Sequence, residues 1–311
     1  MSEKIDVSVV VPLFNEEESL EELYERVVKV LTDAGYSFEV IFVDDGSKDN
    51  SFEVLKSLRN RDKRVKIISF MRNYGKSAAL AEGFRVARGD YVITMDADLQ
   101  DNPEEIPSLI SKLNEGFDLV SGWKKNRKDP ISKTLPSKIF NLVTSLVTGI
   151  KLHDFNCGLK AYRKEVVKRL SIYGELHRFI PVLAEWEGFR VTEKEVTHSE
   201  RKFGKSKFGA SRFLNGFFDL ITVMFITRRA TSPLHLFRSI ALIFFVVGFV
   251  INMYFIIQWI AGMGLHVRPL MVGGFILIVI SIQIGSFGLL AELFSSRIEK
   301  SFSYREYSVD D

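Results

Sequence analysis

The first hundred residues alternate between short apolar runs and longer segments with a helical pattern. Four runs rich in β-branched residues predict buried strands, at Val7–Val11, Glu39–Val43, Val65–Ser69 and Tyr91–Met95. Between them, apolar residues recur at helical spacing over Glu17–Ala34, Asn50–Asn60 and Lys76–Ala87. Strict alternation of strand and helix predicts a mostly parallel α/β sheet with helices on both faces. Ligands of such a sheet bind beyond the carboxyl ends of its strands.

Two long uncharged runs follow in the last third of the chain. Ile240–Ile260 and Leu270–Leu290 contain no Asp, Glu, Lys or Arg. At a helical rise of about 1.5 Å per residue, each run would span roughly the 30 Å of a bilayer core. The pattern therefore predicts two transmembrane helices. A buried helical hairpin in a soluble protein is the alternative.

Basic residues flank this pair of runs on their outer sides. The loop Ala261–Pro269 has only Arg268 as a strongly basic residue, whereas the outer flanks carry Arg228, Arg229, Arg238, Arg297, Lys300 and Arg305. Cytoplasmic flanks of membrane helices are enriched in Lys and Arg. We therefore expect a multi-pass protein of the cytoplasmic (inner) membrane, with the N-terminal domain and both termini in the cytoplasm.

An amphipathic segment precedes the first run. Its apolar residues fall on one helical face, at Phe213, Leu214, Phe217, Phe218, Ile221, Met224 and Phe225. A face of this kind is most often a core face. Here it joins a basic window to a membrane run, which favours a helix that lies in the membrane interface.

The net charge of +3 belongs entirely to the part before Leu234, because Lys/Arg and Asp/Glu balance from there to the end. Two windows in that part are strongly basic, Gly122–Lys138 with six basic residues against one acidic and His198–Arg212 with five against one. Concentrated positive charge favours anionic ligands or a membrane surface. The single cysteine, Cys157, excludes an intrachain disulfide and indicates a reducing compartment.

The fourth predicted strand leads directly into a pair of carboxylates. Asp96 and Asp98 are separated by one small residue and followed by Gln100. Alternate side chains return to the same side of an extended segment, so both carboxylates can approach one hard cation. A bare D-x-D pair is often only a cap or a turn. Its place at the end of a buried strand indicates a metal site that would bridge a donor diphosphate.

Two segments resemble the end of a phosphate-binding P-loop but lack its spacing. Gly75-Lys76-Ser77 and Gly204-Lys205-Ser206 both need a glycine five residues earlier, where the chain has Phe70 and Ser199. No G-x-G-x-x-G follows the first strand either. ATP-binding and dinucleotide-binding folds are therefore disfavoured.

Six motifs occur in a fixed order along the chain: P-L-F-N-E-E, V-D-D-G-S, N-Y-G-K, D-A-D-L-Q-D, D-F-N-C-G-L-K-A-Y-R and R-K-F-G-K-S-K. The series resembles the family-2 inverting glycosyltransferases of GT-A fold. Within them it is similar to the polyprenyl-phosphate glycosyltransferases, the group that includes dolichol-phosphate mannose synthase and bactoprenol glucosyltransferase. The resemblance covers nearly the whole chain, since bacterial members also carry two C-terminal transmembrane helices.

The resemblance implies a role for each matching position on the donor side. Pro12, Phe14, Glu16, Asp44 and Asp45 are expected to hold the base and ribose of a nucleotide sugar. Mg²⁺ or Mn²⁺ is expected at Asp96, Asp98 and Gln100, with Asp96 also facing the donor. The expected contacts to the donor phosphates are Lys76, Arg201 and Lys207. A surface lysine and a solvated basic loop are the alternatives for those three.

On the acceptor side, the resemblance implies a site for the lipid phosphate within the first basic window. The matching positions are Lys124, Arg127, Lys133 and Ser137. Lysine keeps the charge of the arginines found in relatives but loses their bidentate geometry. A plain membrane-surface charge patch is the alternative. Asp154 is the expected catalytic residue, positioning the acceptor or the sugar, with a structural loop aspartate as its alternative.

These expectations give a four-part organisation. Residues 1–207 form the GT-A domain, 208–233 an interfacial helix region, 234–296 a two-helix membrane anchor and 297–311 a cytoplasmic tail. The partners are a nucleotide sugar, a polyprenyl phosphate of the undecaprenyl type and the membrane, with no nucleic acid. A homo-oligomer is left open.

A lipid phosphate is already largely dianionic at neutral pH, because its second pKa lies near 6. Such an acceptor needs no general base, whereas a hydroxyl acceptor would need one. The main rival is therefore a transferase acting on a sugar hydroxyl, including a processive polysaccharide synthase, although no glutamine begins the Q-x-x-R-W motif of processive relatives. A rival of another class is a catalytically silent membrane scaffold or nucleotide-sugar sensor.

Overall fold

The computed structural model describes residues 4–125, 131–199, 233–264 and 267–297. The chain divides into two compact units, Met1–Val223 and Met224–Asp311, called unit 1 and unit 2 below. Residues 208–232 of the predicted interfacial segment 208–233 lie outside the described residues.

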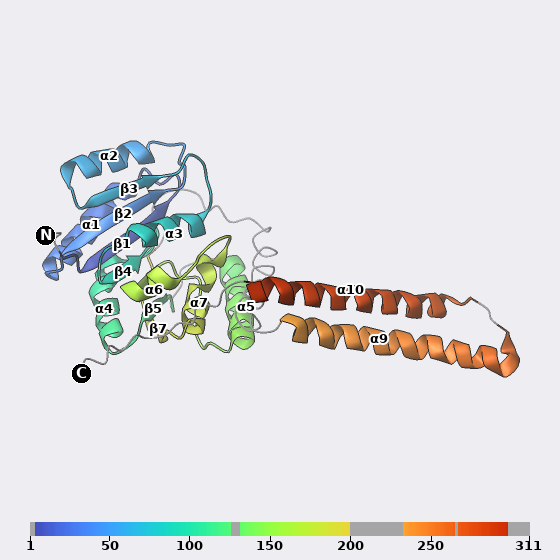
Figure 1. The fold of residues 1–311 in the computed structure, drawn as a ribbon. Helices are drawn as coiled ribbons and strands as arrows, with labels where there is room; N and C mark the ends of the chain where they lie inside the picture. The colour runs from blue at the N-terminus through green and yellow to red at the C-terminus, as the bar shows by residue number, and fades with distance from the viewer. Residues whose placement is uncertain (1–3, 126–130, 200–232, 265–266, 298–311) are drawn as a thin grey trace. The chain divides into compact units, whose positions relative to one another are not determined.

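Unit 1 is an α/β unit in which strands and helices alternate (Figure 1). Its strands are β1 Val7–Leu13, β2 Phe38–Asp44, β3 Val65–Ser69, β4 Tyr91–Thr94, β5 Leu119–Trp123, β6 Lys160–Arg163 and β7 Val191–Glu195. Its α-helices are α1 Leu20–Asp33, α2 Ser51–Arg61, α3 Lys76–Val86, α4 Ile106–Asn114, α5 Ile131–Thr148, α6 Lys164–Arg169 and α7 Ile180–Trp186. Two 3-10 turns, η1 Pro103–Glu105 and η2 Leu176–Phe179, lead into α4 and α7.

The seven strands form one sheet in the order β3-β2-β1-β4-β6-β5-β7. The pairs β3-β2, β2-β1, β1-β4 and β5-β7 are parallel, and β6 runs antiparallel to both of its neighbours, β4 and β5. The first four predicted strands and the three helices between them are confirmed, with ends that differ by a few residues. The mostly parallel α/β sheet is confirmed as well.

Helices cover both faces of this sheet. A buried hydrophobic cluster joins β1 residues such as Val9 to the apolar stripe of α1, where Leu20, Leu23 and Val27 recur at helical spacing. Residues of α2 and α4 belong to the same cluster. On the other face, α3 packs so closely that a Cβ on Gly83 would overlap the Val10 side chain.

The first three strands end in register. Leu13 pairs with Asp44, and Asp44 pairs with Ser69. Because these strands are parallel, the loops after them leave the same edge of the sheet. The polar residues of those loops are therefore brought together although they are far apart in sequence.

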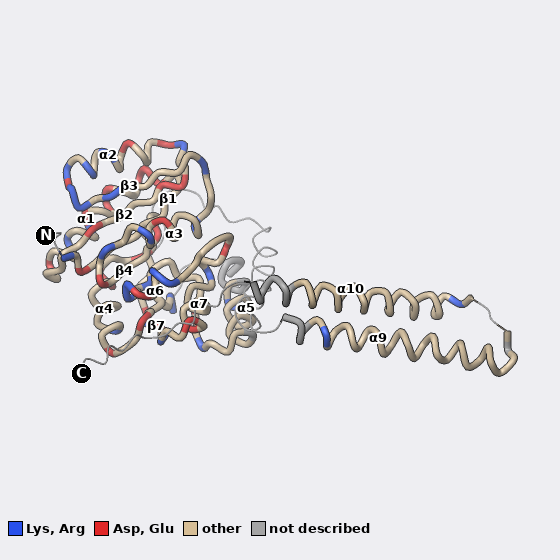
Figure 2. Tube along the Cα trace, in the orientation of Figure 1, with Lys and Arg blue, Asp and Glu red and all other residues tan. Residues whose placement is uncertain are grey.

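Unit 2 consists of two long apolar helices, α9 Pro233–Gln258 and α10 Pro269–Arg297, with a short π-helix, η3 Trp259–Met263, after α9. The stretches Phe237–Gly262 and Pro269–Leu290 are long and apolar enough to cross a membrane, and only 11% of each is buried within the protein. Figure 2 shows charged residues throughout unit 1 and an uncharged trace along most of α9 and α10. Both uncharged runs are therefore confirmed as helices, and they are mostly exposed, unlike the core helices of a soluble protein.

Small residues let α9 and α10 approach closely. A Cβ on Gly274 would lie 2.5 Å from Asn252 Nδ2, and a Cβ on Gly248 would lie 2.6 Å from the Gly274 carbonyl oxygen. Packing of backbone against backbone through glycine is a common device of membrane helices. The neighbouring Gly273 faces open space, since nothing lies within 4 Å of its Cβ position.

This difference gives a matched test of the α9–α10 contact. We expect Gly274→Leu to destabilise the pair by about 1–3 kcal/mol, the usual cost of overfilling a close contact. Gly273→Leu should have little effect. Unfolding of the full chain in mild detergent by added sodium dodecyl sulfate, followed by circular dichroism, measures both variants. Equal midpoints for the two would show that Gly274 is not at the helix contact.

Candidate active site

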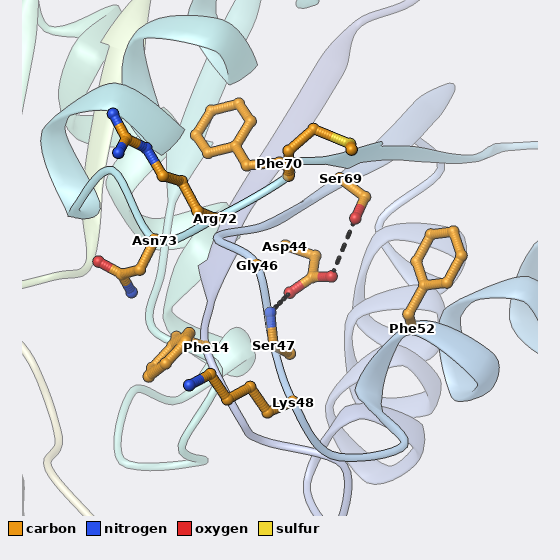
Figure 3. A pocket seen from close by; sticks show the side chains of 11 residues that line it. Phe14, Asp44, Gly46, Ser47, Lys48, Phe52, Ser69, Phe70, Arg72 and Asn73 are labelled. Carbon is orange, nitrogen blue, oxygen red and sulfur yellow. Dashed lines mark hydrogen bonds between the residues drawn. The ribbon is translucent and has the colours of Figure 1, made fainter.

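A pocket opens where β1, β2 and β3 end. It has a volume of about 510 Å³ and is lined by residues of three loops: Phe14, Asp44, Gly46, Ser47, Lys48, Phe52, Ser69, Phe70, Met71, Arg72 and Asn73. Figure 3 shows Asp44 between Ser47 and Ser69, with dashed lines to both. One carboxylate oxygen of Asp44 accepts from the Ser47 amide at 2.9 Å and the other from the Ser69 hydroxyl at 3.1 Å. Aromatic rings, a carboxylate and two cations on one rim can bind a nucleoside by stacking, hydrogen bonds and charge.

The neighbouring Asp45 organises the loop that forms the far wall of this pocket. Its two carboxylate oxygens accept from the amides of Tyr74 at 2.6 Å and Gly75 at 2.9 Å. Burial raises the pKa of Asp45 and the charge of Asp44 adds to this effect, while the two amide bonds oppose it. Gly46 allows the same wall to close, because a Cβ there would lie 2.6 Å from the Arg72 carbonyl carbon.

The D-x-D segment follows β4 as a tight loop. Asp98 accepts a hydrogen bond from the Gln100 amide at 3.2 Å, and Leu99 between them has a left-handed backbone with φ of 60°. An inward carboxylate, Asp101, closes the loop by accepting from the Asp96 amide at 3.1 Å. Asp101 also forms an ion pair with Lys124, at 2.8 Å. The Asp101 side chain is fully buried and that of Lys124 is 11% exposed.

The loop 154–159 packs against the same carboxylates. Gly158 lies so close that a Cβ there would be 2.6 Å from Asp96 Oδ2 and 2.9 Å from Asp101 Oδ2. The Thr94 hydroxyl on β4 donates to the Gly158 carbonyl at 2.8 Å. A glycine is therefore required at this position. Gly158 lies just before β6, and it reaches the carboxylates because β6 is next to β4 in the sheet.

Lys76, the first residue of α3, forms an ion pair with Asp96. Partial burial opposes ionisation of the Asp96 carboxyl, but the charge and hydrogen bond of Lys76 outweigh it and lower its pKa to about 2. Asp96 is thus held as a carboxylate over the whole physiological pH range. Lys124 is held charged as well, because Asp101 raises its pKa despite burial.

The donor set at this loop fits a hard divalent cation. Asp96 and Asp98 offer carboxylate oxygens from one turn, and Gln100 lies in the same loop. In the parts of the chain that the structure describes, no cluster of three or more His, Cys, Asp or Glu could hold a metal alone. A cation bound to the two aspartates would need further oxygens from a ligand or from water, which is typical of Mg²⁺ and its substrate phosphates.

A second, small cavity of about 10 Å³ lies beside Asp96. Lys76, Lys160 and His177 line it from three different elements. The Lys160 ammonium is almost fully buried and donates to the Cys157 carbonyl oxygen, and burial lowers its pKa. The ring of His177 lies 2.9 Å from the Ser77 hydroxyl, which also accepts from the His177 amide.

Asp154 begins the loop that ends at Gly158. It is 2% exposed, and its carboxylate accepts from the Asn156 amide at 3.0 Å. Its carbonyl oxygen accepts from the Ser121 hydroxyl of β5 at 3.2 Å. In this structure Asp154 therefore shapes the loop that supports Asp96, and a direct role in the reaction remains a prediction.

The structure places the other predicted site residues in different parts of unit 1. Phe14 and Asp44 line the larger pocket, while Pro12, Lys76 and Asp96 line the smaller one. Glu16 donates its amide to Ser51 beside them, and Ser137 lies on α5. Arg127, Arg201, Lys207 and the side chain of Lys133 lie outside the described residues.

Sequence reasoning missed Asp101 and Lys160. Asp101 ends the D-A-D-L-Q-D motif and Lys160 lies in G-L-K-A-Y-R, so their positions within these motifs could have marked both as candidate site residues. Their roles depend on partners that are distant in sequence, Lys124 for Asp101 and the sheet position of β6 for Lys160. A match to a sequence motif alone does not identify these distant partners.

Several known proteins are similar in sequence to this chain. Residues 8–171 match the model of a family described as glycosyl transferase family 2. The chain is 38% identical to dodecaprenyl-phosphate galacturonate synthase of Rhizobium johnstonii, over 99% of this chain and 93% of the relative. It is 40% identical to undecaprenyl-phosphate 4-deoxy-4-formamido-L-arabinose transferase of Pseudomonas paraeruginosa, over 84% of this chain and 78% of the relative.

Solved structures share the fold. Glucosyl-3-phosphoglycerate synthase of Mycobacterium tuberculosis, in complex with Mn²⁺, UDP-glucose and phosphoglyceric acid, superposes with a TM-score of 0.55 at 18% identity, covering 71% of this chain and 80% of that one. A mannosyltransferase of Pyrobaculum calidifontis, in complex with GDP-mannose and Mn²⁺, gives a TM-score of 0.51 at 19% identity, covering 72% and 64%. The fold is therefore that of the GT-A enzymes.

The buried ion pair beneath the D-x-D loop can be tested by a double-mutant cycle. Asp101→Asn leaves the Lys124 cation buried without its partner, so we expect a loss of about 3–5 kcal/mol in stability. Lys124→Met should cost a similar amount, and the double variant much less than the sum. Chemical denaturation of the full chain, monitored by near-ultraviolet circular dichroism, measures all four proteins. Additive losses would mean that the two side chains do not interact.

Proposed function

Because this chain belongs to glycosyl transferase family 2, we propose that it transfers a sugar from a UDP- or GDP-linked donor to a polyprenyl phosphate such as undecaprenyl phosphate. The reaction takes place at the membrane, inverts the anomeric carbon and depends on a divalent metal ion. The product is a sugar joined to the lipid through a single phosphate.

The match to the Rhizobium synthase carries this proposal. It extends over 99% of the chain, so that the D-x-D loop and both apolar helices are matched together. Both curated relatives above are named for a polyprenyl-phosphate acceptor. An enzyme for such an acceptor must bind a soluble donor and a membrane lipid at one site. A glycosyltransferase unit followed by two apolar helices of membrane length suits this requirement.

We assign the donor nucleotide to the larger pocket. Phe14 and the buried Asp44 face it, and the loop held by Asp45 closes one side. Lys76 directly follows the loop held by Asp45 and pairs with Asp96, so we place its ammonium at the donor diphosphate. Arg201 and Lys207 are proposed to complete the phosphate contacts.

We assign the metal ion, Mg²⁺ or Mn²⁺, to Asp96, Asp98 and Gln100. The ion supplies positive charge that stabilises the departing nucleoside diphosphate. Asp101 and Gly158 fix Asp96 from below, so this carboxylate is positioned before the donor arrives. Lys76 neutralises Asp96 in the meantime and can move to a donor phosphate oxygen, since both are anionic partners for an ammonium group.

The acceptor phosphate is proposed to bind at the basic window that contains Lys124, Arg127, Lys133 and Ser137. A phosphate dianion attacks without a general base, so the site needs only to hold it in line with the anomeric carbon. Asp154 would then act by positioning. Lys124 is bound to Asp101, so its contribution to the acceptor is a long-range charge unless that pair opens.

The flanking charges favour a cytoplasmic catalytic unit. Arg238 lies before the uncharged run Ile240–Ile260, and the loop Ala261–Pro269 has Arg268 as its strongly basic residue. Nucleotide sugars are cytoplasmic, which agrees with this orientation. We therefore propose a multi-pass protein of the cytoplasmic membrane with both termini inside.

The acceptor chemistry gives the decisive test. Purified full chain should glycosylate undecaprenyl phosphate with one member of a panel of UDP- and GDP-sugars. Undecaprenol and simple sugar hydroxyls should give no product, because no base removes their proton. Mass spectrometry of the lipid fraction detects the products. Efficient transfer to a hydroxyl would instead favour the hydroxyl transferase, and no transfer with any donor would favour the silent scaffold.

The metal site is tested by Asp98→Asn, a nearly isosteric change that removes one ligand charge. We expect turnover to fall to under about a tenth, and Mn²⁺ binding in the presence of nucleoside diphosphate, followed by electron paramagnetic resonance, to weaken in parallel. The exposed Asp33→Asn serves as the matched control. Unchanged Mn²⁺ binding by Asp98→Asn would remove Asp98 from the metal site.

A further inference from the structure

The small cavity beside Asp96 is lined by polar groups from three parts of unit 1. Asp96 follows β4, Lys160 begins β6 and His177 lies on η2. Apolar side chains, among them Leu80 and Ile180, complete its wall. Polar groups that converge between apolar walls are typical of a subsite that recognises one group of a ligand. The assignments above give Lys160 and His177 no role.

The imidazole of His177 is held in a fixed orientation by α3. Its Nδ1 lies 2.9 Å from the Ser77 hydroxyl oxygen, and the same oxygen accepts from the His177 amide at 3.1 Å. Ser77 is 1% exposed, so this contact lies in the interior. Because the hydroxyl oxygen already accepts from the amide, its own proton is available for Nδ1, and this assignment leaves the ring proton on Nε2. The imidazole therefore has a proton to donate at the nitrogen that Ser77 does not occupy.

Lys160 is the most buried of the charged residues that line the cavity. It is 3% exposed, whereas the side chains of Lys76 and Asp96 are 31% and 34% exposed. Its ammonium group has three protons, of which one is donated to the Cys157 carbonyl oxygen. The cavity thus has an accessible end at Lys76 and Asp96 and a closed, cationic end at Lys160.

The volume of the cavity limits what can enter it. At about 10 Å³, it takes about one water-sized group. A phosphate group or a whole sugar ring is too large, whereas a single hydroxyl group fits. A hydroxyl group also matches the lining chemically, since its oxygen can accept from an ammonium or an imidazole while its proton goes to a carboxylate.

We propose that this cavity receives one hydroxyl group of the transferred sugar, and that His177 and Lys160 determine donor specificity by donating hydrogen bonds to it. The inference rests on the proposed function, in which Asp96 faces the donor diphosphate. The sugar is joined to that diphosphate, so its ring lies beside Asp96 at the accessible end of the cavity. A sugar without this hydroxyl group would leave buried donors without an acceptor, which is a strong basis for rejection.

Calorimetric binding of the donor tests this subsite without an acceptor lipid. The full chain in mild detergent with Mg²⁺ is titrated with a panel of neutral and acidic UDP- and GDP-hexoses. The tightest binder is then compared with its monodeoxy analogues and with the plain nucleoside diphosphate. We expect one deoxy analogue to bind about ten- to hundredfold more weakly than the parent, because buried donors lose their acceptor.

Two variants connect this loss to the cavity. His177→Asn keeps an amide group near the position of Nδ1, which preserves the contact with Ser77, but lacks the rest of the ring. In His177→Asn and in Lys160→Met, the ratio between the two dissociation constants should fall by about fivefold or more, while affinity for the nucleoside diphosphate stays unchanged. Tyr173→Phe, at a 58% exposed position just before η2, is the control and should keep the full ratio.

Equal binding of all deoxy analogues by the unmutated chain would overturn the proposal, because the cavity would then hold only water. An undiminished ratio in both variants would overturn it as well. A parallel loss of affinity for the nucleoside diphosphate would do the same, since it would place these side chains at the phosphates. Failed transfer to undecaprenyl phosphate with this binding pattern intact would count against the proposed acceptor alone. If the unmutated chain bound no nucleotide sugar, both the subsite and the proposed function would be wrong.

Discussion

An isolated carboxylate is unstable in a protein interior, so a buried aspartate must be surrounded by donors. Asp101 meets this requirement with the Asp96 amide and the Lys124 ammonium, and Gly158 leaves room for its carboxylate. Three segments that are distant in sequence are thereby fixed to one point: the loop after β4, the end of β5 and the loop before β6. The orientation of the two outward aspartates depends on this inward one.

The alternating strands and helices could be predicted because each has its own local period, and the uncharged runs because their length leaves few alternatives. The place of β6 could not be predicted in the same way. It enters the sheet between β4 and β5 against their direction, and this pairing follows from long-range packing. Gly158 and Lys160 reach the site only through that placement. The residues of the larger pocket were easier to predict, because most of them lie at or directly after the ends of parallel strands that end in register.

Side-chain direction explains the other differences between expectation and structure. Asp44 and Asp45 are adjacent and were expected to share a ligand, yet only Asp44 lines the pocket, and Asp45 holds the amides of Tyr74 and Gly75. Lys124 was expected at the acceptor phosphate because it matches an arginine position of the family, and in the fold its ammonium pairs with Asp101.

The amide of Asn252 in the middle of α9 donates to the Gly248 carbonyl one turn earlier, at 2.8 Å, so its hydrogen bond lies within α9 itself. Before α10 is synthesised, α9 already contains a partner for this polar side chain. The hydrogen bond of this side chain therefore does not depend on α10. In the helix pair, Gly274 of α10 packs against this Asn252 amide. The polar group and the glycine contact of unit 2 are thus separate: Asn252 is satisfied within α9, whereas Gly274 makes the close contact between α9 and α10.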